Sequence, residues 1–200
     1  MPTLVEAENR GDERGALLAY LEAQRGAVRR ALLGLTEEQA ARKPSASGLS
    51  LSGLLKHLVE VEDGWVRTGR GLRYATERDE SNWQESFRLV GDETIAGKLA
   101  EWEEVAARTE RFVREVPDLD ATFALPEAPW FPPGAERSMR WLVLTLIQEV
   151  ARHAGHADII RESLDGKTAF ELVDAAMAAE AGAETETAAE AEAGRQRATA

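Results

Sequence analysis

The segment that decides the fold is Ser138–Leu164, which reads SMRWLVLTLIQEVARHAGHADIIRESL. Apolar side chains recur along it at helical spacing, and Leu142, Leu146 and Ile160 fall on one face. This periodicity is typical of an amphipathic α-helix that buries one side. Gly166 follows shortly afterwards and predicts where the helix ends. We therefore expect a long helix with one face in a hydrophobic core.

Three polar side chains interrupt the apolar face of this segment. At about 100° per residue, Glu149, His153 and His156 fall within roughly 60° of one another. A buried polar group without a partner costs a few kcal/mol, and an unpaired carboxylate costs more. Carboxylate and neutral imidazole are both good ligands for zinc or a similar divalent ion. A metal would satisfy all three groups, whereas a hydrogen-bonded pair of side chains on a helix surface is the plainer interpretation.

The same periodicity predicts further helices and no convincing strands. The predicted long helices are Asp12–Leu35, Ser50–Thr68 and Asp92–Glu115, with a short turn of helix after the capping box that begins at Thr36. A fifth, short helix is predicted at Ala169–Ala179 and is expected to dock through Phe170, Leu172, Val173 and Met177. The expected fold is therefore an all-α four-helix bundle with long crossover loops.

Two connections and the two ends of the chain complete the predicted organisation. We expect residues 72–91 to form an irregular crossover. We expect residues 118–137 to form a proline-rich loop, which either covers one end of the bundle, with Trp130 as a plug, or serves as a lid. Residues 181–200 are rich in alanine and glutamate and lack large apolar side chains, so we expect a disordered tail. The predicted domain is residues 1–180.

Composition narrows the classes of function. The formal net charge is −12, so binding of nucleic acid through bulk electrostatics is not expected. The absence of cysteine excludes disulfides, iron–sulfur sites and a cysteine nucleophile. Without a long apolar run or an apolar N-terminal segment, we expect no membrane span, no secretory signal and a cytoplasmic location. The sequence leaves a homodimer open.

The remaining histidine lies on a different predicted helix. His57 stands on the shoulder of an apolar stripe, beside Leu54 and Val61. A lone histidine in such a place is more often a hydrogen-bonded core residue than a ligand. However, a helix that packs alongside the Ser138–Leu164 helix would bring His57 to Glu149 and the other two histidines, and bundle metal sites are commonly built this way.

Other residues of the Ser138–Leu164 helix are open to interpretation. Arg152 and Arg161 are read as solvated surface charges rather than as contacts for a substrate carboxylate. A glycine inside a helix costs about 1 kcal/mol relative to alanine. Gly155 therefore indicates close approach of another helix, room for a ligand, or neutral variation.

Two segments resemble a known family. The first is LLKHLVEVE at Leu54–Glu62 followed by Trp65, and the second, more specific one is EVARHAGHADIIRE at Glu149–Glu162 followed by Gly166. Both are similar to motifs of the DinB-like superfamily, in its actinobacterial branch that includes mycothiol-dependent maleylpyruvate isomerases, and the resemblance spans Asp12 to Gly166. It implies a four-helix bundle that holds zinc or nickel through three side chains. His57, Glu149 and His153 match that ligand pattern.

The resemblance leaves the role of His156 open. This residue is an additional ligand, a replacement for Glu149, or a general base. The resemblance further implies a metal-dependent S-transferase or isomerase that uses a low-molecular-weight thiol, such as mycothiol, and a small electrophile. The alternative is a non-enzymatic metal-binding bundle with a structural, stress-response or partner-binding role.

Overall fold

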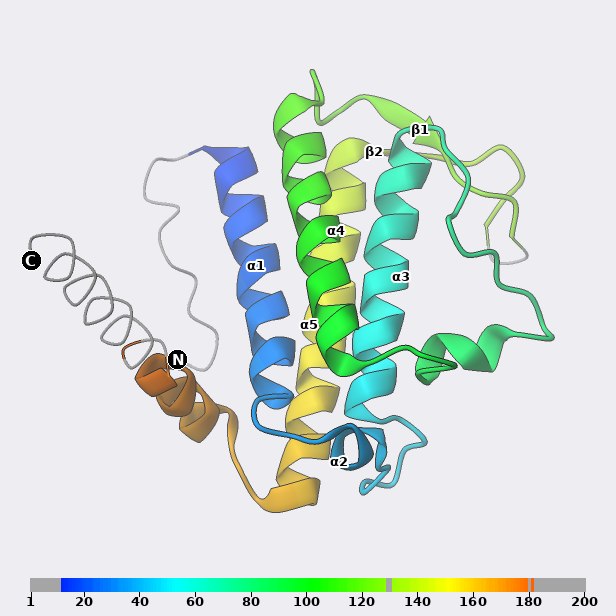
Figure 1. The fold of residues 1–200 in the computed structure, drawn as a ribbon. Coiled ribbons are helices and arrows are strands. Elements are labelled where there is room, and N and C mark those ends of the chain that lie inside the picture. Colours follow the sequence, from blue (N-terminus) through cyan, green and yellow to red (C-terminus); the bar gives the residue numbers. More distant parts are fainter. Residues whose placement is uncertain (1–11, 129–130, 180, 182–200) are drawn as a thin grey trace, which may run out of the picture.

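The computed structural model describes residues 12–128, 131–179 and 181, and its body is a bundle of four long helices (Figure 1). These helices are α1 (Glu13–Ala31), α3 (Leu51–Gly69), α4 (Ile95–Glu115) and α5 (Met139–Asp165). A short helix, α2 (Glu37–Ala41), follows α1, and a 3-10 helix, η1 (Trp83–Phe87), precedes α4. The all-α four-helix bundle predicted from periodicity is confirmed.

Side-chain caps explain why most of these helices begin where they do. The Asp12 carboxylate accepts from the backbone N–H of Arg14, and Ser50 and Ser138 cap α3 and α5 in the same manner. Each cap satisfies a backbone donor that the first turn of a helix leaves unpaired. The prediction for α4 was wrong by two residues, because Thr94 caps this helix rather than Asp92.

The chain crosses over once within the bundle. Lys56 contacts Glu93 near the start of α3, and Asp63 contacts Arg108 further along both segments, so α3 and α4 run parallel. Helix α5 runs antiparallel to α3 and also packs against α1. Two consecutive parallel helices need a long connection, which residues 70–94 supply on the outside of α3 (Figure 1).

The end of α1 differs from the prediction, which extended this helix to Leu35. The helix ends at Ala31, and Gly34 adopts a φ of 72° in the turn that follows. Arg161 of α5 stabilises this turn, because its Nη1 donates at 2.8 Å to the carbonyls of both Ala31 and Leu33. Arg161 is 1% exposed, so its interpretation as a solvated surface charge was wrong.

A small hairpin corrects the prediction that the chain has no strands. Strands β1 (Thr122–Ala124) and β2 (Glu136–Ser138) pair antiparallel, with Phe123 opposite Arg137. Each strand has three residues, which is too short to show a period-2 pattern in the sequence. Phe123 is buried and anchors the hairpin at one end of the bundle. Trp130, the predicted plug, lies outside the described residues.

The helix after α5 spans residues 169–179 and is attached by fewer side chains than predicted. Leu172 is 2% exposed and docks it, whereas Phe170 and Met177 are 59% and 58% exposed. The predicted boundary at residue 180 and the predicted disordered tail, apart from residue 181, lie outside the described residues. None of the helices that the structure describes has the length and apolar character needed to cross a membrane.

Candidate metal centre

His57 lies near the middle of α3 and is held by a neighbouring aromatic ring. Its imidazole stacks on Phe87 of η1, with ring centroids 4.4 Å apart and an interplanar angle of 20°. Gly53, one turn earlier on α3, permits this contact, since a Cβ at that position would lie 2.1 Å from the carbonyl oxygen of Phe87. His57 is 8% exposed, so its ring has little freedom to turn away.

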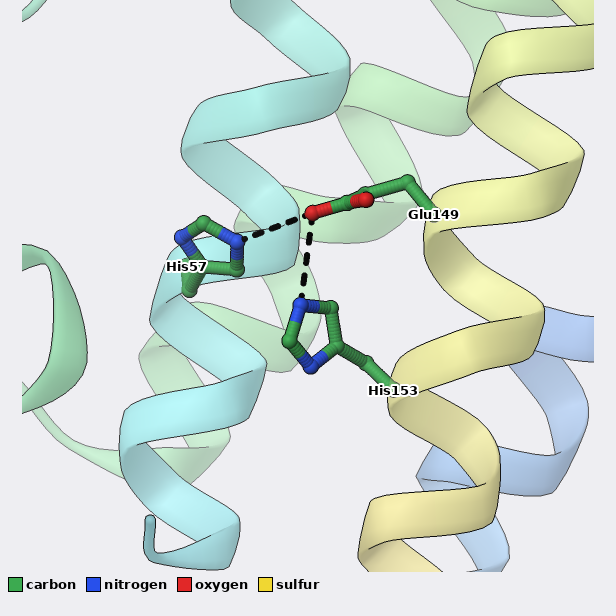
Figure 2. A group of neighbouring side chains, drawn as sticks. All are labelled: His57, Glu149 and His153. Atoms are coloured by element: carbon green, nitrogen blue, oxygen red, sulfur yellow. Dashed lines mark hydrogen bonds and ion pairs between the residues drawn. The ribbon is translucent and has the colours of Figure 1, made fainter. Parts of the chain in front are cut away.

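Glu149 and His153 project from α5 toward His57 (Figure 2). They stand one helical turn apart and therefore share a face of the helix. Oε1 of Glu149 lies 3.3 Å from Nε2 of His57 and 3.3 Å from Nε2 of His153. His153 is buried, and the Glu149 side chain is 30% exposed. The structure thus brings three of the four predicted site residues together at the α3–α5 interface.

The geometry of this trio suits a divalent metal. The three residues each offer one ligand atom, and these atoms lie within 4.8 Å of one another. A separation of 3.3 Å is longer than the usual N–H···O distance of about 2.9–3.0 Å. In a tetrahedral zinc shell with bonds of about 2.0–2.1 Å, neighbouring ligand atoms lie about 3.3–3.4 Å apart. The donor set therefore suits such an ion, and the two separations from Glu149 to the histidines match those of its shell.

The charge on Glu149 is stabilised in place. Hydrogen bonds from His153 and then His57 lower the pKa of this carboxyl far below its ordinary value, although burial opposes the shift. The carboxylate is therefore ionised at neutral pH, which is the form that binds a cation. A metal at this position would replace the hydrogen-bonded protons of the two imidazoles as the positive partner of Glu149.

His156 lies beside the trio rather than within it. Its Nδ1 is 3.2 Å from Nδ1 of His153, on the opposite side of the His153 ring from Glu149. Burial, together with nearby His153 and Arg152, lowers the pKa of His156. The neutral form of its imidazole therefore predominates at neutral pH.

Aromatic side chains extend along the same two helices from the trio. The Trp65 ring of α3 meets Trp141 of α5 with centroids 5.4 Å apart, and Phe131 approaches Trp65 at 6.4 Å. The guanidinium of Arg137 lies 5.6 Å from the centre of the Trp141 ring. The sequence pattern assigned Trp65 to the core stripe of its helix, but it contained no signal that Phe87 or Phe131 would return to α3.

The fold and this trio define a four-helix bundle with a candidate metal centre between α3 and α5. A model of the mycothiol-S-transferase family matches residues 16–166, and the chain belongs to this family. The resemblance to the DinB-like superfamily that the two sequence motifs predicted is thereby confirmed. No protein with a curated function matches the sequence.

The fold is shared with solved structures. The crystal structure of a conserved protein from Enterococcus faecalis superimposes with a TM-score of 0.62 at 14% sequence identity. The match covers 78% of this chain and 99% of that one. At this level of identity the similarity supports the four-helix fold alone.

Proposed function

We propose that this protein is a divalent-metal-dependent S-transferase that joins a low-molecular-weight thiol to a small electrophile. The observation that carries the proposal is the His57, Glu149 and His153 trio, whose ligand atoms converge from two helices of a mycothiol-S-transferase family member. Mycothiol is the thiol that the family suggests, and zinc or nickel is the metal that we expect. A transferase is favoured over an isomerase because the matched family is named for mycothiol S-transfer.

The donor set suits activation of a thiol. A bound divalent ion supplies a positive charge that lowers the pKa of a thiol and favours the nucleophilic thiolate. With two neutral imidazoles and one carboxylate, the site would carry a net charge of about +1, which a single thiolate neutralises. Three protein ligands leave one position of a four-coordinate ion for that thiolate.

The overall reaction is a substitution at an electrophilic carbon. A sulfur–carbon bond forms, the bond to the leaving group breaks, the leaving group departs with its electron pair, and the thiol proton is released. The residues of this chain hold the reacting groups and limit access of water. His57 and His153 are buried, and the aromatic rings of Trp65 and Trp141 lie half-buried between the same two helices.

Metal binding is the first test. Elemental mass spectrometry of the purified protein, after incubation with zinc or nickel, is expected to find about one ion per chain. The ion is expected to be lost in His57→Ala and in His153→Ala. Glu162→Gln, an exposed position further along α5, is the matched control and should retain the ion. A folded wild type that takes up neither metal would refute the proposal.

Transfer activity is the second test. The metal-loaded protein is mixed with mycothiol and monochlorobimane, and formation of the fluorescent thioether is followed over time. We expect a rate above the uncatalysed reaction that depends on metal and disappears in the His57→Ala variant. Bacillithiol, glutathione and cysteine in separate reactions test the preference for the thiol. Metal binding without transfer from any of these thiols would favour the non-enzymatic alternative.

A further inference from the structure

The two ring nitrogens of His153 have different partners. Nε2 faces the candidate metal position, 3.3 Å from Oε1 of Glu149. Nδ1 faces away from it, 3.2 Å from Nδ1 of His156. The two imidazoles are tilted by 57° with their centroids 5.2 Å apart, so they meet through these nitrogens rather than by stacking.

A contact between two ring nitrogens requires one donor and one acceptor. A neutral imidazole carries its proton on one nitrogen and a lone pair on the other. His153 can offer a lone pair at Nε2 to a metal only if its own proton is on Nδ1. That proton then points at His156 Nδ1, which must be the acceptor, and His156 carries its proton on Nε2.

We infer that His156 is a positioning residue that accepts from the Nδ1–H of metal-bound His153 and so aims its Nε2 at the metal. This inference rests on the proposed metal-dependent function. It gives His156 a role different from the three that the sequence left open, because a nitrogen that accepts from His153 Nδ1 cannot also be a ligand of the ion at His153 Nε2. Ligand histidines usually donate their second N–H to a partner that fixes the tautomer and the ring orientation.

The two histidine ligands are therefore oriented in different ways. The ring of His57 lies flat against the ring of Phe87, and this stacking restricts the rotation of the imidazole. The ring of His153 is held at its far nitrogen by His156 from the next turn of α5. Because His156 is on the same helix as Glu149 and His153, it stays beside Nδ1 of His153 whether or not a metal is bound. Without a metal, His153 donates from Nε2 to Glu149, and His156 donates to Nδ1. When a metal takes Nε2, the two protons shift and His156 becomes the acceptor.

A matched pair of variants separates positioning from packing. His156→Asn keeps an acceptor, since the Asn side-chain oxygen is the same number of bonds from the backbone as His Nδ1. His156→Leu has the same branched arrangement of side-chain heavy atoms as Asn and no acceptor. Zinc affinity is measured by competition with a chromophoric chelator, and the His153 tautomer is read from nitrogen-15 NMR of the zinc-loaded proteins.

We expect His156→Leu to weaken zinc binding by roughly 10- to 100-fold, the usual effect of removing such a partner. His156→Asn should bind zinc nearly as tightly as the wild type, with His153 protonated on Nδ1 in both. Equal affinity and an unchanged tautomer in His156→Leu would overturn the inference. Equal losses of zinc affinity in both variants would also overturn the inference, because the acceptor at position 156 would then make no difference to zinc binding. A wild type that binds no zinc would instead refute the proposed function on which the inference rests.

Discussion

His57 and Glu149 lie 92 positions apart in the sequence, yet Nε2 of the first is 3.3 Å from Oε1 of the second. The contact joins α3 to α5 across their antiparallel interface. Four residues further along α5, His153 reaches the same oxygen atom. Glu149 is thus the shared partner of both histidines, and the site depends on its charge.

Replacement of that charge tests the site directly. Glu149→Gln keeps the size and the hydrogen-bonding capacity of the side chain but removes the anionic ligand. We expect the metal-free variant to fold normally and to lose most of its affinity for zinc and nickel, because a neutral amide is a poor ligand for these ions. Isothermal titration calorimetry measures the loss. Wild-type affinity in Glu149→Gln would show that the carboxylate is not a ligand.

A second carboxylate, Glu62 of α3, has a structural role. Glu62 is completely buried and accepts from Arg25 Nε at 3.0 Å, Trp102 Nε1 at 2.9 Å and Thr109 Oγ1 at 2.6 Å. These contacts tie α1 and α4 to α3. In Glu62→Gln an amide would face Arg25, whose buried charge would then keep only the exposed carboxylate of Glu22 on its own helix as an anionic partner. We expect a loss of about 3–5 kcal/mol in the free energy of unfolding.

Urea denaturation monitored by circular dichroism measures this loss. The matched control is Glu110→Gln, which removes the anion from the exposed Arg114–Glu110 pair. An exposed pair is worth less than about 1 kcal/mol, so the control should unfold close to the wild type. Similar midpoints for the two variants would show that the buried network contributes little to stability.

The stability of the protein is expected to depend on pH through a third carboxylate, that of Glu93. Glu93 accepts from Lys56 Nζ at 2.7 Å and from the backbone N–H of Val90 at 2.8 Å, and Lys56 is 1% exposed. Burial alone would raise the pKa of Glu93, but these donors and Lys98 together lower it below 4.5. Because the folded pKa is lower than the unfolded value, the stabilisation is complete above about 4.5 and is lost as the pH falls through the folded value.

Glu93→Gln should therefore be less stable than the wild type by about 1–3 kcal/mol at neutral pH, since it leaves a buried ammonium with a weaker partner. The difference should stay constant from neutral pH down to about 4.5 and shrink at lower pH, as Glu93 of the wild type becomes protonated. Thermal unfolding across this pH range measures both curves. A difference that stays constant with pH would contradict the ionised pair.

The sequence predicted the parts of this molecule that repeat along a helix. Periodic apolar residues and polar caps located the four long helices, and the spacing of Glu149 and His153 placed them on one face. The contact between His57 and Glu149 depends on how α3 and α5 pack against each other. Periodicity alone does not predict this packing; the DinB-like resemblance implied it, and the structure shows the two side chains side by side. Contacts made by single residues of irregular segments have no period, so the stacking of Phe87 and the β1–β2 hairpin could not be predicted.

The reason for the glycine at position 155 could not be predicted from the sequence either. Its place inside a helix indicated close approach of another helix, room for a ligand or neutral variation. A Cβ there would meet no atom within 4 Å, so close packing is not the reason for this glycine. Instead, Gly155 borders a cavity of about 230 Å³ between α1, α5 and the helix at residues 169–179.

Gly53 links the packing of the bundle to the candidate metal centre. In Gly53→Ala the new Cβ would lie 2.1 Å from the Phe87 backbone carbonyl, so η1 must move away from α3. Phe87 would then lose its stacking on His57. We expect a loss of about 1–3 kcal/mol in stability from overpacking, together with weaker zinc binding.

The matched control for this variant is Gly64→Ala on the same helix. Its new Cβ would lie 2.2 Å from a ring carbon of Tyr74, but that side chain is 38% exposed and can rotate away. Alanine also favours the helix by about 1 kcal/mol, so the control should be as stable as the wild type and bind zinc equally well. Thermal unfolding of the metal-free proteins and zinc titration separate the two effects. If Gly53→Ala lost stability but kept full zinc affinity, the stacking of Phe87 on His57 would have no part in holding the metal ligand.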